Sequence, residues 1–207
     1  MTMRVAVAIS GRGSNLEALL RSLRPGAPAE IVLALSDRAD APGLEHARTR
    51  GIPAVVLGNP ADGGVWLEHL AQHRIDLIVL AGYLKLVPAT VIAAYHRRII
   101  NTHPSLLPAF AGKGMYGDRV HRAVLESGAR ESGATVHLVD EAYDRGEVLA
   151  QVRVPVLPGD DPARLAARVL EVEHRLLPAV VLAAAEAGHP VHLDPPGVGP
   201  RLLTPDR

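Results

Sequence analysis

Residues 4–23 read RVAVAISGRGSNLEALLRSL, and this stretch sets the fold. Residues 4–9 are apolar and partly β-branched, which predicts a short buried strand. A glycine-containing turn over 10–15 follows. Leucines at 16, 19, 20 and 23 then fall on one face of a helix, which Pro25 and Gly26 end. The chain therefore opens with a strand, a turn and a helix.

The same alternation continues along the first half of the chain. Strands are expected at 31–35, 53–57, 75–81 and 98–102, and helices at 42–50, at 65–73 and after Pro88. Strands that are apolar on both faces and alternate with helices indicate a parallel sheet covered on both sides. The sequence therefore predicts an α/β protein with a Rossmann-like, mostly parallel sheet and helices on both faces.

The second half has a different pattern. Two β-rich runs, 135–139 and 148–156, lie close together, which predicts an antiparallel extension of the sheet after the parallel part. A long helix is expected over 161–186, interrupted near Pro178. The tail, 188–207, is rich in proline and glycine, and either a short hairpin (190–193 with 201–203) or a loose surface segment suits it.

Composition narrows the class of protein. The chain has 207 residues, which fits one domain, and its formal net charge is zero. A neutral chain gives no electrostatic reason to expect nucleic acid or a membrane surface as partner. The absence of cysteine excludes disulfides, thiolate metal sites and a cysteine nucleophile. Without a signal-peptide pattern or a long apolar run, a cytoplasmic protein is expected.

The turn at 10–15, SGRGSN, is the first candidate site. Glycines permit positive φ and close ligand approach, and the helix start offers unpaired N–H groups and a positive dipole end. Ser14 or Asn15 can cap the helix. The turn suits a single phosphate, because it matches neither the dinucleotide nor the P-loop glycine pattern. A capped turn that binds nothing is the alternative.

The second candidate site lies in RRIINTHPSLLP, residues 97–108. Asn101 and His103 are two residues apart at the carboxyl end of an expected strand, so their side chains share one face. Pro104 keeps His103 out of the helical region, and ligands of open α/β sheets bind at this end of the strands. Asp144 lies in the loop 140–146, and the sequence alone does not bring it to His103. A structural histidine and a solvated turn are the alternatives.

Taken together and in order, these motifs resemble the folate-dependent phosphoribosylglycinamide formyltransferases. The resemblance covers about 4–193 and rests on SGxGSN at 10–15, AGY at 81–83, NxHPSLLP at 101–108 and the loop 140–146. It implies that an amine of glycinamide ribonucleotide attacks the formyl carbon of 10-formyltetrahydrofolate, a co-substrate, in purine synthesis. It further implies a phosphate-binding half (1–100), a catalytic and folate half (101–187) and the tail (188–207), all within one domain.

The resemblance also assigns catalytic roles. Asn101 matches a residue that donates its amide to the formyl oxygen, and His103 matches the catalytic acid, which steadies the oxyanion as imidazolium. Asp144 matches a carboxylate that raises the histidine pKa and orders a water for proton relay. We therefore expect a raised pKa for His103 in the folded protein.

The remaining implied contacts concern the two substrates. The ribonucleotide is expected on backbone groups of the first turn and on a helix glutamate: Gly13, Ser14, Asn15, Leu16, Glu17 and Glu173. The folate is expected against two loops and the catalytic asparagine: Leu84, Lys85, Leu86, Val87, Asn101, Asp140, Glu141, Ala142 and Tyr143. No metal is needed, the partners are small molecules only, and either a monomer or a homodimer is expected.

Two segments depart from some relatives. Residues 57–66 offer no arginine for the folate tail, and 110–119 form a longer, glycine-rich loop. That loop is interpreted as a flap where Lys113 or Arg119 meets anionic substrate, or as an ordinary variable loop.

Rival readings remain. Methionyl-tRNA formyltransferase and formyltetrahydrofolate deformylase share the chemistry, although the first is expected to carry a further domain and a basic surface, and the second an extra N-terminal domain. A sugar-nucleotide formyltransferase shares the Asn-x-His core. A noncatalytic phosphate-binding module explains the first turn, but gives no reason for Asn101, His103 and Asp144.

Overall fold

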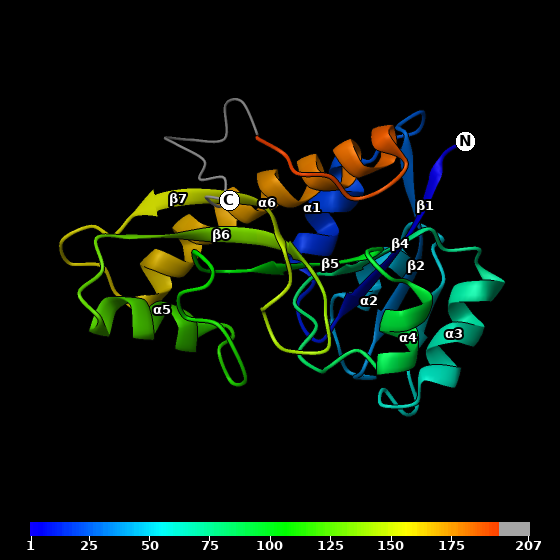
Figure 1. The fold of residues 1–207 in the computed structure, drawn as a ribbon, viewed down its shortest axis with the longest axis horizontal. Coiled ribbons are helices and arrows are strands. Elements are labelled where there is room, and N and C mark those ends of the chain that lie inside the picture. Colours follow the sequence, from blue (N-terminus) through cyan, green and yellow to red (C-terminus); the bar gives the residue numbers. More distant parts are fainter. Residues whose placement is uncertain (195–207) are drawn as a thin grey trace.

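The computed structural model describes residues 1–194, and a single sheet forms its centre (Figure 1). Its strands are β1 (Met3–Ile9), β2 (Ala29–Ser36), β3 (Ala54–Val56), β4 (Leu77–Leu80), β5 (Ile99–His103), β6 (Glu131–Leu138) and β7 (Val148–Pro155). They lie in the order β3-β2-β1-β4-β5-β6-β7. The pairs among β1 to β5 are parallel, whereas β6 and β7 join antiparallel. The predicted mostly parallel sheet with an antiparallel extension is confirmed.

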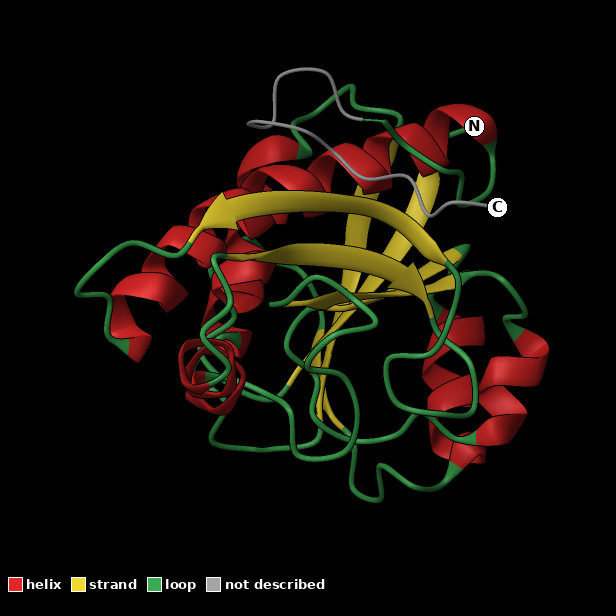
Figure 2. Ribbon diagram, turned by 60° about the vertical axis from the view of Figure 1, so that its left-hand side comes forward, coloured by secondary structure: helices red, strands yellow, loops and turns green. Residues whose placement is uncertain are grey.

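Helices cover both faces of this twisted sheet (Figure 2). They are α1 (Ser14–Ser22), α2 (Leu44–Arg48), α3 (Gly63–Gln72), α4 (Ala89–Ala94), α5 (Asp118–Glu126) and α6 (Pro162–Ala187). Strand β1 divides its side chains between two cores by the two-residue period of a strand. Val5, Val7 and Ile9 pack with residues of α1, α2 and α6, whereas Ala6 and Ala8 pack with residues of α3 and α4.

The strand order creates the place for a site. From β1 the chain moves outward to β2 and β3, and then returns to the other side of β1 for β4 and β5. The loops that follow β1 and β4 therefore diverge, and a crevice opens at the carboxyl ends of these strands, where ligands of such sheets bind. The glycine turn after β1 and the end of β5 both lie at this crevice.

The long C-terminal helix differs from its prediction. The expected interruption at Pro178 is wrong, because α6 runs through Pro178 as one helix of 26 residues. Proline removes one backbone hydrogen bond, but Pro178 is buried, as are Leu176, Leu177 and Val181 beside it. Burial of each such side chain contributes about 1.5–3 kcal/mol, which offsets the lost bond.

One strand begins earlier than expected, and the expected hairpin of the tail falls partly outside the described residues. Strand β6 begins at Glu131, four residues before the expected 135, because the antiparallel ladder with β7 extends that far. Residues 190–193 form no strand, although the Leu193 amide donates to the Leu149 carbonyl (2.9 Å). The expected partner strand, 201–203, lies outside the described residues. Within residues 1–194, none of the helices combines the length and the apolarity that a membrane crossing requires.

Candidate active site

The turn after β1 depends on a glycine at position 13. Gly13 has φ 72°, in the left-handed region, and precedes the first residue of α1. A Cβ on Gly13 would lie 2.8 Å from the Cα of Gly43. Two glycine backbones therefore pass too closely for any side chain, which fixes the path of the turn against the segment before α2.

The start of α1 leaves backbone donors free for a ligand. The first four N–H groups of a helix have no partner within it, and here they belong to Gly13, Ser14, Asn15 and Leu16. The Glu17 amide already donates to the Gly13 carbonyl (2.9 Å), so it is not among the free donors. The expected cap by Ser14 or Asn15 is wrong, because no side chain in the described part of the chain caps α1. The amide of Asn15 instead points toward α6.

A cavity of about 1000 Å³ adjoins this turn and reaches the end of β5. Its wall includes the glycine turn, the end of β5, Asp144, the segment 112–119, and α6. The structure therefore brings the first predicted site and the second into one space, a relation that their separation of about ninety positions in the sequence does not reveal.

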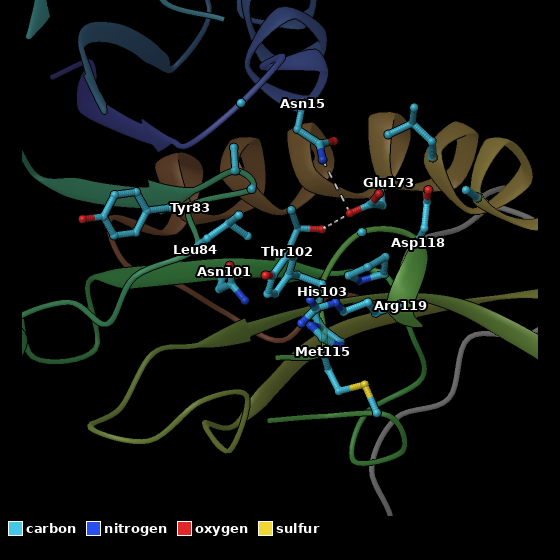
Figure 3. A pocket seen from close by; sticks show the side chains of 18 of the residues that line it. Asn15, Tyr83, Leu84, Asn101, Thr102, His103, Met115, Asp118, Arg119 and Glu173 are labelled. Atoms are coloured by element: carbon cyan, nitrogen blue, oxygen red, sulfur yellow. Dashed lines mark hydrogen bonds between the residues drawn. The ribbon is translucent and has the colours of Figure 1, made fainter. Parts of the chain in front are cut away.

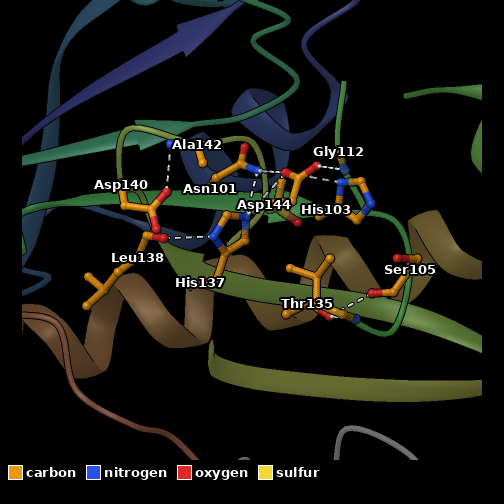
Figure 4. Close-up of polar contacts among 12 residues, drawn as sticks. Asn101, His103, Ser105, Gly112, Thr135, His137, Leu138, Asp140, Ala142 and Asp144 are labelled. Atoms are coloured by element: carbon orange, nitrogen blue, oxygen red, sulfur yellow. Dashed lines mark hydrogen bonds and ion pairs between the residues drawn. The ribbon is translucent and has the colours of Figure 1, made fainter. Parts of the chain in front are cut away.

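Asp144 lies between the side chains of β5 and β6 (Figure 4). Its Oδ1 lies 3.5 Å from Nδ1 of His103 and 3.4 Å from Nδ2 of Asn101. Its Oδ2 accepts from the Gly112 amide at 3.0 Å. Burial acts to raise the pKa of Asp144, but His137, His103 and the Gly112 amide outweigh it, so the pKa is lowered. Asp144 is therefore an anion that faces His103.

The expectation for the pKa of His103 is wrong. His103 is 4% exposed, and burial lowers its pKa by more than the charge of Asp144 raises it. The Phe110 carbonyl, which accepts from Nε2 at 2.9 Å, also acts to raise the pKa, and His137 acts to lower it. The sequence argument counted the carboxylate but not the desolvation of the ring. Burial therefore holds the pKa of His103 below its ordinary value, in spite of the carboxylate beside it.

His137 belongs to the site, although the sequence argument did not single it out. Its Nδ1 lies 2.8 Å from the Leu138 carbonyl, which can only accept, so Nδ1 carries a proton. Nδ2 of Asn101 can only donate, so Nε2 of His137 accepts from it at 3.0 Å, and Nε2 also lies 3.6 Å from Oδ1 of Asp144. This pairing fixes the amide of Asn101 with its nitrogen toward His137 and Asp144. The alternation of β6 places His137 and Thr135 on one face, which the pairing with β5 makes the face of Asn101 and His103, and this alternation was a signal available in the sequence.

On α6, Glu173 faces the end of β5 (Figure 3). It is 6% exposed, and its Oε1 accepts from the Thr102 hydroxyl (2.9 Å) and more distantly from Nδ2 of Asn15 (3.5 Å). Burial raises the pKa of Glu173 to about 7, against the lowering effect of these two donors. A buried carboxyl that titrates near neutrality thus lies on the cavity wall.

The two loops expected to contact folate follow β4 and β6 and line a common small cavity beside β5. Leu84 and Lys85 line the large cavity. A neighbouring cavity of about 60 Å³ is lined by residues of both loops: Lys85, Leu86, Val87, Asp140, Ala142 and Tyr143. Glu141 is exposed and lines neither cavity. Leu84 and Leu86 are exposed hydrophobic residues, as suits a wall that covers an aromatic ligand.

The glycine-rich segment after β5 covers one side of the large cavity. Lys113, Met115, Tyr116 and Arg119 all line it, and the Arg119 guanidinium lies 5.1 Å from the Tyr116 ring centroid. The Gly112 amide ties the segment to Asp144. Both cations named from the sequence therefore border the site. Within residues 1–194, no group of three or more His, Asp or Glu is arranged to hold a metal ion.

The fold and the site define a class of protein. The sequence model of the formyl transferase family matches residues 3–181. This chain therefore belongs to the formyl transferase family. Its relatives then specify the branch: a solved phosphoribosylglycinamide formyltransferase from Brucella melitensis superposes with a TM-score of 0.81 and 44% identity, over 89% of this chain and 96% of that one. The chain belongs to the phosphoribosylglycinamide formyltransferases.

Curated relatives agree with this assignment. The phosphoribosylglycinamide formyltransferase of Haemophilus influenzae is 36% identical over 185 residues, which span 86% of this chain and 85% of that protein. The chloroplastic enzyme of Arabidopsis thaliana is 45% identical over 191 residues. This chain spans 65% of the Arabidopsis protein and 61% of its counterpart from Vigna unguiculata.

Proposed function

We propose that this protein transfers the formyl group of 10-formyltetrahydrofolate to the amine of 5′-phosphoribosylglycinamide, giving the N-formyl product and tetrahydrofolate in the synthesis of the purine IMP. One observation carries the proposal. A single cavity presents free helix N–H groups at one end and the cluster of Asn101, His103 and Asp144 at the other. The first suits a phosphate, and the second suits acyl transfer between nitrogen atoms.

The reaction requires an oxyanion to be stabilised and one proton to be moved. The amine attacks the formyl carbon, and its nitrogen gains a positive charge while the formyl oxygen becomes an anion. In this step the ring carries its proton on Nδ1, beside Asp144, and Nε2 leaves the Phe110 carbonyl to take the proton from the attacking nitrogen. The imidazolium then lies between Asp144 and the oxyanion and returns the proton to N10 as the C–N10 bond breaks. Asp144 assists by stabilising this charged form, directly and through a relay water.

Asn101 is placed to donate to the formyl oxygen. One of its N–H groups is held by His137 at 3.0 Å, whereas the other makes only a long contact with Asp144, 3.4 Å between heavy atoms. In the proposal the formyl oxygen replaces Asp144 as acceptor of that second N–H. A side-chain donor fixed before the reaction stabilises the developing anion without reorganisation.

Substrate contacts complete the proposal. The amides of Gly13, Ser14, Asn15 and Leu16 bind the phosphate, and Glu173 binds the glycinamide end. The folate lies against 84–87 and the loop 140–144. Within one domain, residues 1–100 form the phosphate-binding half and 101–187 the catalytic and folate half, with 84–87 and Glu173 as the contacts that each half makes to the other substrate. The substrates are small molecules, the protein acts in the cytoplasm, and we expect a monomer or a homodimer that needs no metal.

A direct assay tests the function. The purified protein is mixed with the ribonucleotide and 10-formyl-5,8-dideazafolate, and the ultraviolet change on loss of the formyl group is followed with and without the ribonucleotide. We expect a change that requires the ribonucleotide and falls by at least about 10²-fold in His103→Ala. The exposed His96 provides a matched control, and His96→Ala should retain the rate.

Other outcomes would overturn the proposal in distinct ways. A change without acceptor would indicate a deformylase. No change with a folded protein that still binds the ribonucleotide would indicate a noncatalytic binding module. Transfer to another amine, but not to this one, would indicate a different formyltransferase.

A further inference from the structure

Thr102 stands between the two catalytic residues of β5 but faces away from them. Side chains alternate along a strand, so Asn101 and His103 share one face of the sheet with His137 and Thr135 of β6, while Thr102 points to the other face, toward α6. Its hydroxyl donates to Oε1 of Glu173 at 2.9 Å, a contact between residues 71 positions apart (Figure 3). Thr102 is 6% exposed and lines the large cavity. The strand that carries the chemistry is thereby joined to the helix that carries Glu173.

The same carboxyl is joined to the phosphate-binding turn. Nδ2 of Asn15, in the first turn of α1, lies 3.5 Å from Oε1 of Glu173. Both protein donors therefore meet one carboxyl oxygen, and residues 1–194 supply no hydrogen bond to the other, Oε2. Since Glu173 lines the cavity, Oε2 is the oxygen available to a ligand.

A second observation shows that this cluster lacks a partner. Oδ1 of Asn15 is buried, with the residue 8% exposed, and no group in the described part of the chain donates to it. A buried acceptor without a donor is unfavourable, because its hydrogen bond to water is lost and not replaced. Two oxygen atoms that lie between the phosphate turn and His103 therefore have no donor within residues 1–194. They are Oδ1 of Asn15 and Oε2 of Glu173. Ribose hydroxyls and a primary amine are such donors.

We propose that Thr102 is a positioning residue for the acceptor substrate, whose hydroxyl holds Oε1 of Glu173 so that Oε2 meets a hydroxyl or amine of that substrate. The proposal rests on the proposed function, because it specifies how the acceptor is held. Thr102 touches Glu173 and acts through it. It sets where the acceptor lies between the free N–H groups of α1 and the imidazole of His103.

Steady-state kinetics and binding of the ribonucleotide test this role. Thr102→Val keeps the shape of the side chain and removes the hydroxyl, whereas Thr102→Ser keeps the hydroxyl. We expect Val to raise the KM and Kd of the ribonucleotide about tenfold, equivalent to about 1.4 kcal/mol, because the Glu173 carboxyl loses the hydrogen bond that holds it. The kcat and the KM of the formyl donor should change less than about twofold. Ser should restore the ribonucleotide KM to within about threefold of wild type.

A double-mutant cycle separates positioning from general structure. If Thr102 acts through Glu173, Thr102→Val should have little further effect on ribonucleotide binding in a Glu173→Ala background. An equal effect in both backgrounds, a fall in kcat without a change in KM, or a failure of Ser to rescue would overturn the proposal. Unchanged kinetics in Thr102→Val would also overturn it.

A readout without substrate keeps the proposal testable if the proposed function fails. The Glu173 carboxyl can be followed by carbon NMR in protein labelled with ¹³C-glutamate. Loss of the Thr102 donor should move its titration to higher pH, and an unmoved titration would overturn the proposal. Thr102→Val alters none of the titratable side chains that line the same cavity, which include His103 on β5 and His121 and Asp118 on α5. Failure of the function would appear instead as absence of ribonucleotide-dependent transfer by the wild type.

Discussion

Glu173→Gln should make the protein more stable at alkaline pH. Burial raises the pKa of Glu173 from 4.5 to about 7, so the folded protein holds this proton more tightly than the unfolded chain. Below pH 4.5 both states carry the proton. As the pH rises toward 7 the unfolded chain loses it first, and the folded state becomes progressively less stable. Glutamine keeps the shape of the side chain and has no proton to lose.

The magnitude follows from the two pKa values. A pKa that differs by one between the folded and unfolded states changes the free energy of unfolding by about 1.4 kcal/mol. The rise from 4.5 to about 7 therefore lowers the stability of the wild type by about 3 kcal/mol once both states have lost the proton. Part of this penalty is already present at pH 5. Between pH 5 and pH 8 the unfolding free energy of Glu173→Gln should therefore rise by about 2–3 kcal/mol relative to wild type.

Urea unfolding at pH 5 and pH 8 measures this quantity. Contributions from other titrating groups cancel, because only the difference between variant and wild type is compared. Glu171→Gln is the matched control, since Glu171 is exposed on the same helix, and it should alter stability by less than about 0.5 kcal/mol at either pH. The reasoning is refuted if Glu173→Gln and wild type differ by the same amount at both pH values, because burial would then not hold the proton on Glu173.

Three further substitutions probe the framework of the site. Gly13→Ala places a Cβ 2.8 Å from the Cα of Gly43, on a residue with φ 72°. Urea unfolding should therefore show a free energy of unfolding lower by about 1–2 kcal/mol or more. An unfolding free energy equal to that of wild type would contradict the close approach. Tyr83→Phe removes a buried hydroxyl that has no partner among the described residues, so the unfolding free energy should stay unchanged or rise by up to about 1 kcal/mol, with Tm unchanged or higher. A clear fall in Tm would mean that this hydroxyl has a partner. Asp161→Ala removes the side chain that accepts from the Arg164 amide (2.8 Å) at the start of α6, and should cost about 1 kcal/mol in urea unfolding; no loss would show that this cap contributes little.

Local patterns determined the elements of this protein. The apolar run over 4–9, the glycine turn and the leucine spacing of α1 are each properties of neighbouring residues, and they predicted the strand, the turn and the helix correctly. The apolar strands likewise predicted the sheet class, because burial on both faces leaves few other arrangements. The motif around Asn101 and His103 identified candidate residues through a family resemblance.

Tertiary structure alone decided how these residues act. Asp144 and His137 reach Asn101 only because β6 pairs antiparallel with β5. The pKa of His103 is lowered because the assembled fold removes water from the ring, an effect that outweighs the carboxylate beside it. Thr102 meets Glu173 across 71 positions because α6 packs against the sheet at the end of β5. Sequence patterns report what neighbouring residues prefer, whereas burial and long-range contacts, which set charge and orientation in the cavity, exist only once distant segments have packed together.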